Sequence, residues 1–172
     1  MTSKLIKDGQ ICQDTWYLLD ADTLGDTQAD KLREHDGDNI IVPLSCWLEI
    51  REQLKTRQGQ TGVWLQSNET PAVLTQDLKD LPLIALNFPV FSDGRAYTSA
   101  RELRQNLEYQ GEIRAIGDVL RDQLFYMQRC GFNAFALRDD QDLNAALGAF
   151  DDFRDAYQAS ADRPIPLFRR RA

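Results

Sequence analysis

The feature that most constrains the fold is a series of short apolar runs that recur about every twenty residues after position 39. They occupy residues 39–42, 63–66, 83–88, 112–116 and 134–137. Apolar residues with helical spacing follow each run, in segments 47–54, 74–81, 100–107, 118–130 and 143–157. Because a chain must cross back over a sheet before a parallel strand can pair, this alternation predicts a mostly parallel α/β sheet.

Five such βα units suffice for an open three-layer sheet or a half-barrel, and are too few for a complete eight-stranded barrel. The first 39 residues are acidic and irregular, but Asp8-Gly9 predicts a tight turn in a β hairpin over 4–11. Residues 16–19 suggest one more short strand. We therefore expect three parts: an N-terminal segment (1–39), an α/β domain (40–160) and a basic tail (161–172).

The chain has 172 residues, 42% of them hydrophobic, and a formal net charge of −7, which disfavours binding to nucleic acid or anionic lipid. The first residues lack the apolar core of a secretory signal, and no run is long enough to span a membrane, so a cytoplasmic location is expected. A single histidine and three widely spaced cysteines offer little for a metal site or a disulfide framework. No cofactor signature is evident, because neither GxGxxG nor GxxxxGK occurs.

Ligands of parallel α/β proteins collect at the carboxyl ends of the strands, so the loop after run 83–88 is the first place to search for a site. There, Arg95 precedes a helix that we expect to be capped by Thr98 or Ser99 and that carries Arg101. With the helix N-terminus, Arg95 and Arg101 are candidates to bind an anion. The alternative is an ordinary solvated helix face, with Arg104 paired to Glu108.

Arg114 is a charged residue within the fourth predicted strand, and we consider it a third candidate for the anion site. A charge at such a position needs either an exposed sheet end or a buried carboxylate. Asp93 and Asp118, which follow neighbouring strands, are candidate partners, and either is also a candidate acid or base.

The predicted helix 118–130 places Gln123 on its apolar side, where an amide must bridge to the backbone or contact a ligand. Phe125, Tyr126 and Arg129 fall on or beside its outward face and are candidate contacts for a partner. Asp122, on the same face, is a candidate acid, base or structural group. Cys130 lies on the inward face at the helix C-terminus, where the dipole disfavours a thiolate, so a packed thiol is favoured over a reactive one.

The tail 163–172 joins two prolines and an apolar pair to four arginines. It is predicted either to strap an acidic surface, on this chain or on a second subunit of a homodimer, or to stay disordered.

The blocks 88–101 and 111–132, which include Asp93-Gly94-Arg95-Ala96-Tyr97 and Gly117-Asp118, resemble a bacterial family classed as a domain of unknown function. The likeness extends over about residues 40–157. That family is encoded beside assimilatory sulfite reductase and is described as an oxidoreductase involved in sulfite reduction. One departure is Ala96, which stands where the family commonly has glycine. No catalytic assignment accompanies the resemblance.

The resemblance implies a role in sulfur assimilation, and two hypotheses follow. In the first, the protein is an accessory component that docks on sulfite reductase or on its electron donor. In the second, it is a small enzyme or sensor that binds sulfite or sulfate with Arg95, Arg101 and Arg114. A third hypothesis, independent of the resemblance, is a scaffold protein outside sulfur metabolism. The sequence leaves open whether the protein is itself catalytic.

Overall fold

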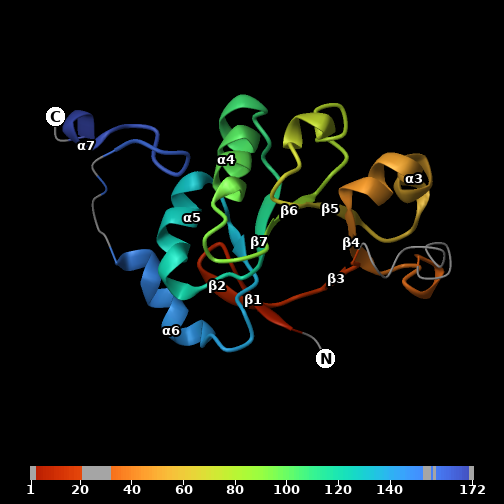
Figure 1. The fold of residues 1–172 in the computed structure, drawn as a ribbon, viewed down its shortest axis with the longest axis horizontal. Helices are drawn as coiled ribbons and strands as arrows, with labels where there is room; N and C mark the ends of the chain where they lie inside the picture. The colour runs from red at the N-terminus through yellow and green to blue at the C-terminus, as the bar shows by residue number, and fades with distance from the viewer. Residues whose placement is uncertain (1–2, 21–31, 153–155, 157, 171–172) are drawn as a thin grey trace.

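The computed structural model describes residues 3–20, 32–152, 156 and 158–170. One curled, half-barrel sheet of eight strands forms the centre of the molecule (Figure 1). Its strands are β1 (Lys4–Lys7), β2 (Gln10–Gln13), β3 (Trp16–Leu18), β4 (Asn39–Pro43), β5 (Thr61–Leu65), β6 (Leu83–Phe88), β7 (Glu112–Gly117) and β8 (Ala134–Phe135). The helices are α3 (Leu44–Thr56), α4 (Arg95–Arg101), α5 (Leu124–Cys130), α6 (Leu143–Leu147) and α7 (Leu167–Arg170). No helix within the described ranges is long and apolar enough to cross a membrane.

The strands lie in the order β2-β1-β8-β7-β6-β5-β4-β3, and β3 to β8 are parallel neighbours in chain order. The prediction of a mostly parallel sheet is thus confirmed, with β3 as a further parallel strand beyond the five expected. The expected hairpin is also present: Asp8 and Gly9 have φ values of 49° and 76°, and β1 pairs antiparallel with both β2 and β8.

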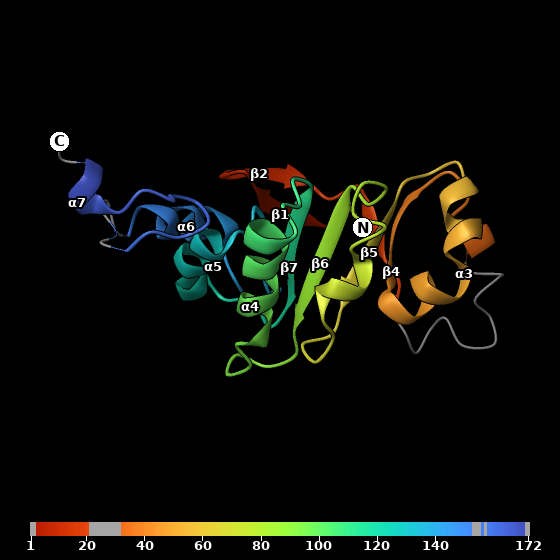
Figure 2. The same cartoon turned by 90° about the horizontal axis from the view of Figure 1, so that it is seen from above.

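The two faces of the sheet are covered differently. Alternate strand residues such as Val63, Ile84 and Ile113 pack on one face with buried side chains of α3, α4, α5 and α6. The other face holds a smaller apolar cluster, whose buried members all lie on strands: Ile41, Trp64, Leu83, Ala85 and Ile116. Trp16 and Ala136 are partly buried and pack against this cluster. Figure 2 shows α4 lying along β6 and β7 on the helix-covered side.

The face that carries this smaller cluster is the inner face of the curl, and the N-terminal part of the chain encloses it. Strands β2 and β3 are opposite edges of the sheet, yet only Asp14 and Thr15 separate them in sequence. Three Cα steps reach at most about 11 Å, so the two edges must approach each other closely. Residues 10–18 therefore bridge the open side of the curl, pairing first with β1 and then with β4. This curl is what keeps the inner cluster away from water.

Three predicted helices differ from the structure. The prediction of a helix over 74–81 is wrong: a 3₁₀ turn spans Pro71–Leu74, and residues 75–80 form further turns. Segment 118–130 becomes helical only at Arg121, since Leu120 is extended and α5 proper starts at Leu124. Segment 143–157 is an α-helix to Leu147 and a 3₁₀ turn to Asp151; residues 153–155 and 157 lie outside the described part. Helix α4 starts at Arg95 with Gly94 as its N-cap, so neither Thr98 nor Ser99 caps it.

Candidate docking site at the carboxyl ends of the strands

Polar side chains gather where β5, β6, β7 and β8 end, as expected for a parallel sheet. Asn87 Nδ2 donates to Gln66 Oε1 over 2.9 Å, which joins the ends of β6 and β5. Arg95 donates to Ser67 Oγ over 2.8 Å. We call this group the carboxyl-end cluster; its members are Gln66, Ser67, Asn87, Asp93, Arg95, Asp118, Arg138 and Asp140.

Arg95 is held by its near neighbour in sequence. Its Nε and Nη2 atoms donate to the two oxygens of Asp93, over 2.9 and 2.7 Å. Hydrogen bonds from Arg95 and then from Ser67 hold the pKa of Asp93 well below its usual range. The carboxylate is therefore charged at neutral pH and offsets the guanidinium, although the Arg95 side chain remains 60% exposed.

Asp118 connects the loops after β6 and β7 through its two carboxylate oxygens. Its Oδ2 accepts from the backbone N–H of Phe91 over 2.9 Å, and its Oδ1 accepts from Arg138 over 2.7 Å. Gly117 precedes it with a φ of 91°, and a Cβ at that position would meet the carbonyl oxygen of Phe88. A glycine is thus required both by the backbone conformation and by the close approach of the strands.

Arg138 has a second carboxylate partner. Its Nε and Nη2 donate to the two oxygens of Asp140, over 2.7 and 2.8 Å. The Arg138 hydrogen bond lowers the pKa of Asp140 to about 2. In the carboxyl-end cluster both arginines are thus held in ion pairs, and three carboxylates, Asp93, Asp118 and Asp140, outnumber them by one.

An aromatic face lies beside this cluster, on the first turns of α4 and α5. The rings of Tyr97 and Tyr126 are 5.0 Å apart, and Arg101 lies 5.7 Å from the Tyr126 ring and donates to its hydroxyl over 3.3 Å. Phe91 lies in the loop that leads into α4, six residues before Tyr97, and its backbone N–H is held by Asp118. We call Phe91, Tyr97, Arg101 and Tyr126 the aromatic face. Phe91 and Tyr126 are about half exposed, at 51% and 47%.

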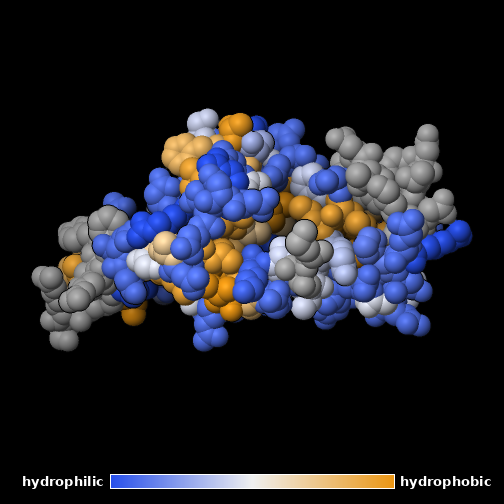
Figure 3. All heavy atoms as spheres, turned by 90° about the horizontal axis from the view of Figure 1, so that it is seen from below, coloured by the Kyte–Doolittle hydropathy of each residue, from blue (hydrophilic) through white to orange (hydrophobic). Residues whose placement is uncertain are grey.

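Charged residues lie close to the aromatic face in sequence, since Asp93 and Arg95 stand between Phe91 and Tyr97. The β6–α4 loop protrudes near the middle of the molecule's long axis, at the lower edge of the view in Figure 2. On the side drawn in Figure 3, apolar side chains reach the surface on a protrusion and within a hollow, bordered by hydrophilic residues. Exposed apolar groups with a polar rim are typical of partner-binding surfaces.

Arg114 lies elsewhere, on the inner face of the sheet. Its side chain is 3% exposed; Nε donates to Glu112 over 2.7 Å and Nη1 to both oxygens of Asp14 over 3.0 Å. Of the two settings predicted for Arg114, pairing with buried carboxylates is the one observed, but the partners are Glu112 and Asp14 and neither Asp93 nor Asp118. Arg101 belongs to the helix-covered side. Arg95, Arg101 and Arg114 therefore share no partner, and the structure does not bring them together.

The remaining candidates belong to the start and end of α5. Gln123 is buried and its Oε1 accepts from the Leu120 N–H over 3.0 Å, which is the structural bridge considered from the sequence. Asp122 is exposed. Phe125 is half-buried with Arg129 stacked 6.0 Å from its ring. Arg129 was expected on the outward face, but it is buried because the C-terminal part of the chain packs over it.

Cys130 is fully buried next to Arg101 and Tyr126. Burial raises the pKa of its thiol, and the neighbouring arginine does not reverse this effect. The described residues contain no group of three or more His, Cys, Asp or Glu arranged to hold a metal ion.

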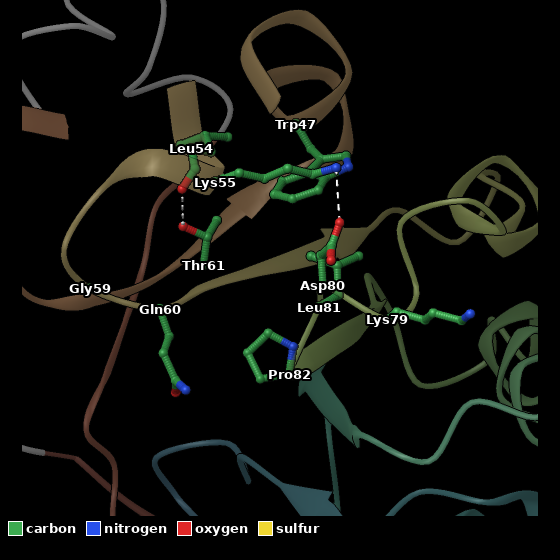
Figure 4. Close-up of a pocket in the computed structure, with 10 residues that line it drawn as sticks. All are labelled: Trp47, Leu54, Lys55, Gly59, Gln60, Thr61, Lys79, Asp80, Leu81 and Pro82. Atoms are coloured by element: carbon green, nitrogen blue, oxygen red, sulfur yellow. Dashed lines mark hydrogen bonds and ion pairs between the residues drawn. The ribbon is translucent and has the colours of Figure 1, made fainter. Parts of the chain in front are cut away.

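A cavity of about 420 Å³ occurs at the other end of the sheet, before β5 and β6 (Figure 4). Lys55 spans its wall between Asp77 and Asp80, 3.0 Å from an oxygen of each. Burial alone would raise the pKa of Asp77, but hydrogen bonds from Trp47 and Lys55 outweigh it and lower the pKa. Most of the charge around this cavity is thus committed to ion pairs that join α3 to the 77–80 turns.

Sequence reasoning missed several members of the carboxyl-end cluster: Gln66, Ser67, Asn87 and Arg138. A signal for them was available, because each lies at or directly after the end of a predicted strand. It also missed Trp47 and Lys55 in the cavity wall and their common partner Asp77, for which the sequence offered no signal beyond helical spacing.

The structure defines this protein as an α/β protein with a curled, mostly parallel sheet. The chain belongs to the family described as "Bacterial protein of unknown function (DUF934)", whose profile matches residues 62–168. That stretch contains every residue of the carboxyl-end cluster and the aromatic face. No curated protein and no solved structure matches the chain.

Proposed function

We propose that this protein is an accessory component of assimilatory sulfite reduction that docks on sulfite reductase or on the electron donor of that enzyme. The pathway in this proposal comes from the resemblance described above. The docking mode comes from the surface, and the aromatic face is its proposed contact region.

The observation that carries the docking mode is the contrast between charges and aromatic rings at the carboxyl ends. The cluster's arginines, Arg95 and Arg138, each hold a carboxylate through two hydrogen bonds, so their charges are largely offset. Phe91 and Tyr126, in contrast, leave about half of their surface to water. A partner that covers these rings gains apolar burial without having to break an ion pair.

Growth of a deletion strain tests the pathway. We expect no growth on sulfate or sulfite, growth on sulfide, and full complementation by the wild-type gene. Normal growth of the deletion strain on sulfite would remove the sulfur assignment.

Complementation by variants tests the docking face. The double variant Phe91→Ala/Tyr126→Ala should fold and fail to complement. Its matched control, Leu48→Ala/Val73→Ala, removes two apolar side chains that are exposed to a similar degree, 48% and 46%, on α3 and the turn after β5. Equal complementation by both double variants would contradict the aromatic face as the contact region.

An anion site is the second candidate function, and the exposure of Arg95 favours it. Thermal unfolding in millimolar sulfite or sulfate separates the two functions, because an anion that binds only the folded state stabilises it by RT ln(1 + [anion]/Kd) and so raises the midpoint. Docking predicts no change. A rise in the midpoint that Arg95→Ala abolishes would replace docking with anion binding.

A further inference from the structure

The C-terminal segment, residues 163–172, has a charge opposite to the rest of the chain. It contains four arginines, Arg163, Arg169, Arg170 and Arg171, and no Asp or Glu. The whole chain has 20 Lys and Arg against 27 Asp and Glu, so residues 1–162 have a formal charge of −11. A segment of charge +4 is thus joined to a strongly acidic body.

Arg129 fixes the point at which this segment leaves the body. The backbone N–H of Ala161 donates to the Arg129 carbonyl over 3.0 Å, and the Ser160 hydroxyl donates to the same oxygen. The Arg129 guanidinium donates to the Gln158 carbonyl and lies 3.8 Å from Asp162. These contacts account for the burial of an arginine that the sequence placed on an outward face.

Beyond this anchor, the segment extends away from the sheet, with α7 at one extremity of the molecule (Figures 1 and 2). Phe168 and Ile165 are 63% and 54% exposed, the highest values among the large apolar side chains that the structure describes. Arg169 lies 5.8 Å from the Phe168 ring. Among the described residues, Phe168, Ile165 and Arg169 thus place exposed apolar side chains and a positive charge together in this segment.

We propose that this segment docks on the acidic body of a second copy of this chain, so that two copies exchange their C-terminal segments. Charge complementarity favours this occupant, because every copy carries both the basic segment and the acidic surface. Such a reciprocal contact closes into a symmetric dimer. Residues 139–152 are the proposed counter-surface: five aspartates and no Lys or Arg occur there, and Asp139 and Asp151 are exposed.

The mass in solution tests the proposal, measured on the full chain by light scattering after size exclusion. At low salt we expect twice the chain mass of 19.7 kDa. Raising the salt from about 50 mM to about 500 mM should shift the mass toward the monomer, because screening weakens exposed charge pairs. A single-chain mass at low salt across the concentration range would overturn the proposal, including the case in which the segment folds back on its own body.

Charge reversal identifies the surfaces. Arg169→Glu/Arg170→Glu should lower the dimer fraction at least tenfold, and Phe168→Ala should also lower it. The control Lys4→Glu/Lys79→Glu makes the same change in net charge at two exposed lysines outside the segment and should leave the dimer intact. Equal effects of the two double variants would show that net charge alone is responsible and contradict a specific contact.

Restoring the opposite charge is the sharpest test. Asp139→Lys/Asp151→Lys should weaken the dimer, and adding it to Arg169→Glu/Arg170→Glu should recover the dimer, with basic and acidic surfaces exchanged. Failure to recover would exclude residues 139–152 as the counter-surface. None of these outcomes depends on sulfite reduction, so this proposal and the proposed function can fail separately.

Discussion

Two clusters of arginine and carboxylate groups lie at different depths in this protein. In the curl of the sheet, Arg114 is 3% exposed and its partners Glu112 and Asp14 are 6% and 13% exposed. At the carboxyl ends, Arg95 is 60% exposed, although its partner Asp93 is 12% exposed, so the difference in depth lies in the arginine. The hydrogen-bond lengths are similar, between 2.7 and 3.0 Å. The comparison teaches that distance alone does not tell a structural ion pair from a surface one; the exclusion of water does.

The two pairs also differ in sequence separation. Asp93 and Arg95 are two residues apart, so the unfolded chain can form the same pair. Asp14 and Arg114 are 100 residues apart, and their contact exists only when residues 10–18 bridge the edges of the sheet. The inner pair therefore reports on the closure of the fold, and the outer pair on a local loop.

Replacement of Arg114 should give the largest loss of stability. Arg114→Ala leaves the carboxylates of Glu112 and Asp14 without their arginine, and breaking a buried pair in this way costs about 3–5 kcal/mol. Lys7, which is 2.7 Å from Glu112, compensates only part of the charge. Urea unfolding monitored by tryptophan fluorescence measures the change.

Asp14→Asn is the milder companion variant. It keeps an oxygen that can accept from the Trp16 N–H and removes only the charge, so we expect a loss of about 1–3 kcal/mol, the usual range for one buried polar partner. If Asp14→Asn were neutral while Arg114→Ala destabilised the protein, the bridge between the sheet edges would not depend on this ion pair.

Alkaline pH should give the next largest effect and extends the comparison to tyrosines. Burial raises the pKa of Tyr97 to about 12 and raises the pKa of Tyr109 as well. The unfolded chain releases these protons near pH 10, so the stabilisation is complete below pH 10 and is lost as the pH rises toward 12. The raised pKa values of Lys7 and Lys55 act in the same direction.

A variant isolates the contribution of Tyr97. The free energy of unfolding should fall less steeply between pH 10 and pH 11 in Tyr97→Phe than in the wild type, because the variant lacks the buried hydroxyl whose pKa is raised. Identical slopes in the two proteins would mean that Tyr97 does not contribute.

The sequence was sufficient to predict the strands of this fold. Runs such as 83–88 and 112–116 match β6 and β7 because buried parallel strands are continuous apolar runs with sharp ends. The hairpin followed from Asp8-Gly9 for an equally local reason. Helix 74–81 was wrong because leucines with helical spacing also suit a series of turns that pack on the core.

The candidate site could be predicted only in part. The rule that ligands and polar loops collect at strand ends pointed to Asp93, Arg95 and Asp118. The partner of Arg114 could not be found in this way, since Asp14 is distant in sequence and reaches Arg114 only through the curl of the sheet. The predicted exposure of Arg129 was wrong because a helical wheel cannot anticipate a later segment of the chain that covers the helix.

Arg95→Ala should have the smallest effect and completes the comparison. Asp93 is 12% exposed beside the arginine, and removal of the exposed Arg95 side chain opens the carboxylate to water, so the urea midpoint should stay within the error of the measurement in low and in high salt. Arg114→Ala, measured in the same series, is the positive control for a pair that excludes water. A loss for Arg95→Ala close to that of Arg114→Ala would contradict the distinction by depth. It would instead indicate that the contact of Arg95 with Ser67 fixes the β6–α4 loop, and with it the position of Phe91 on the aromatic face.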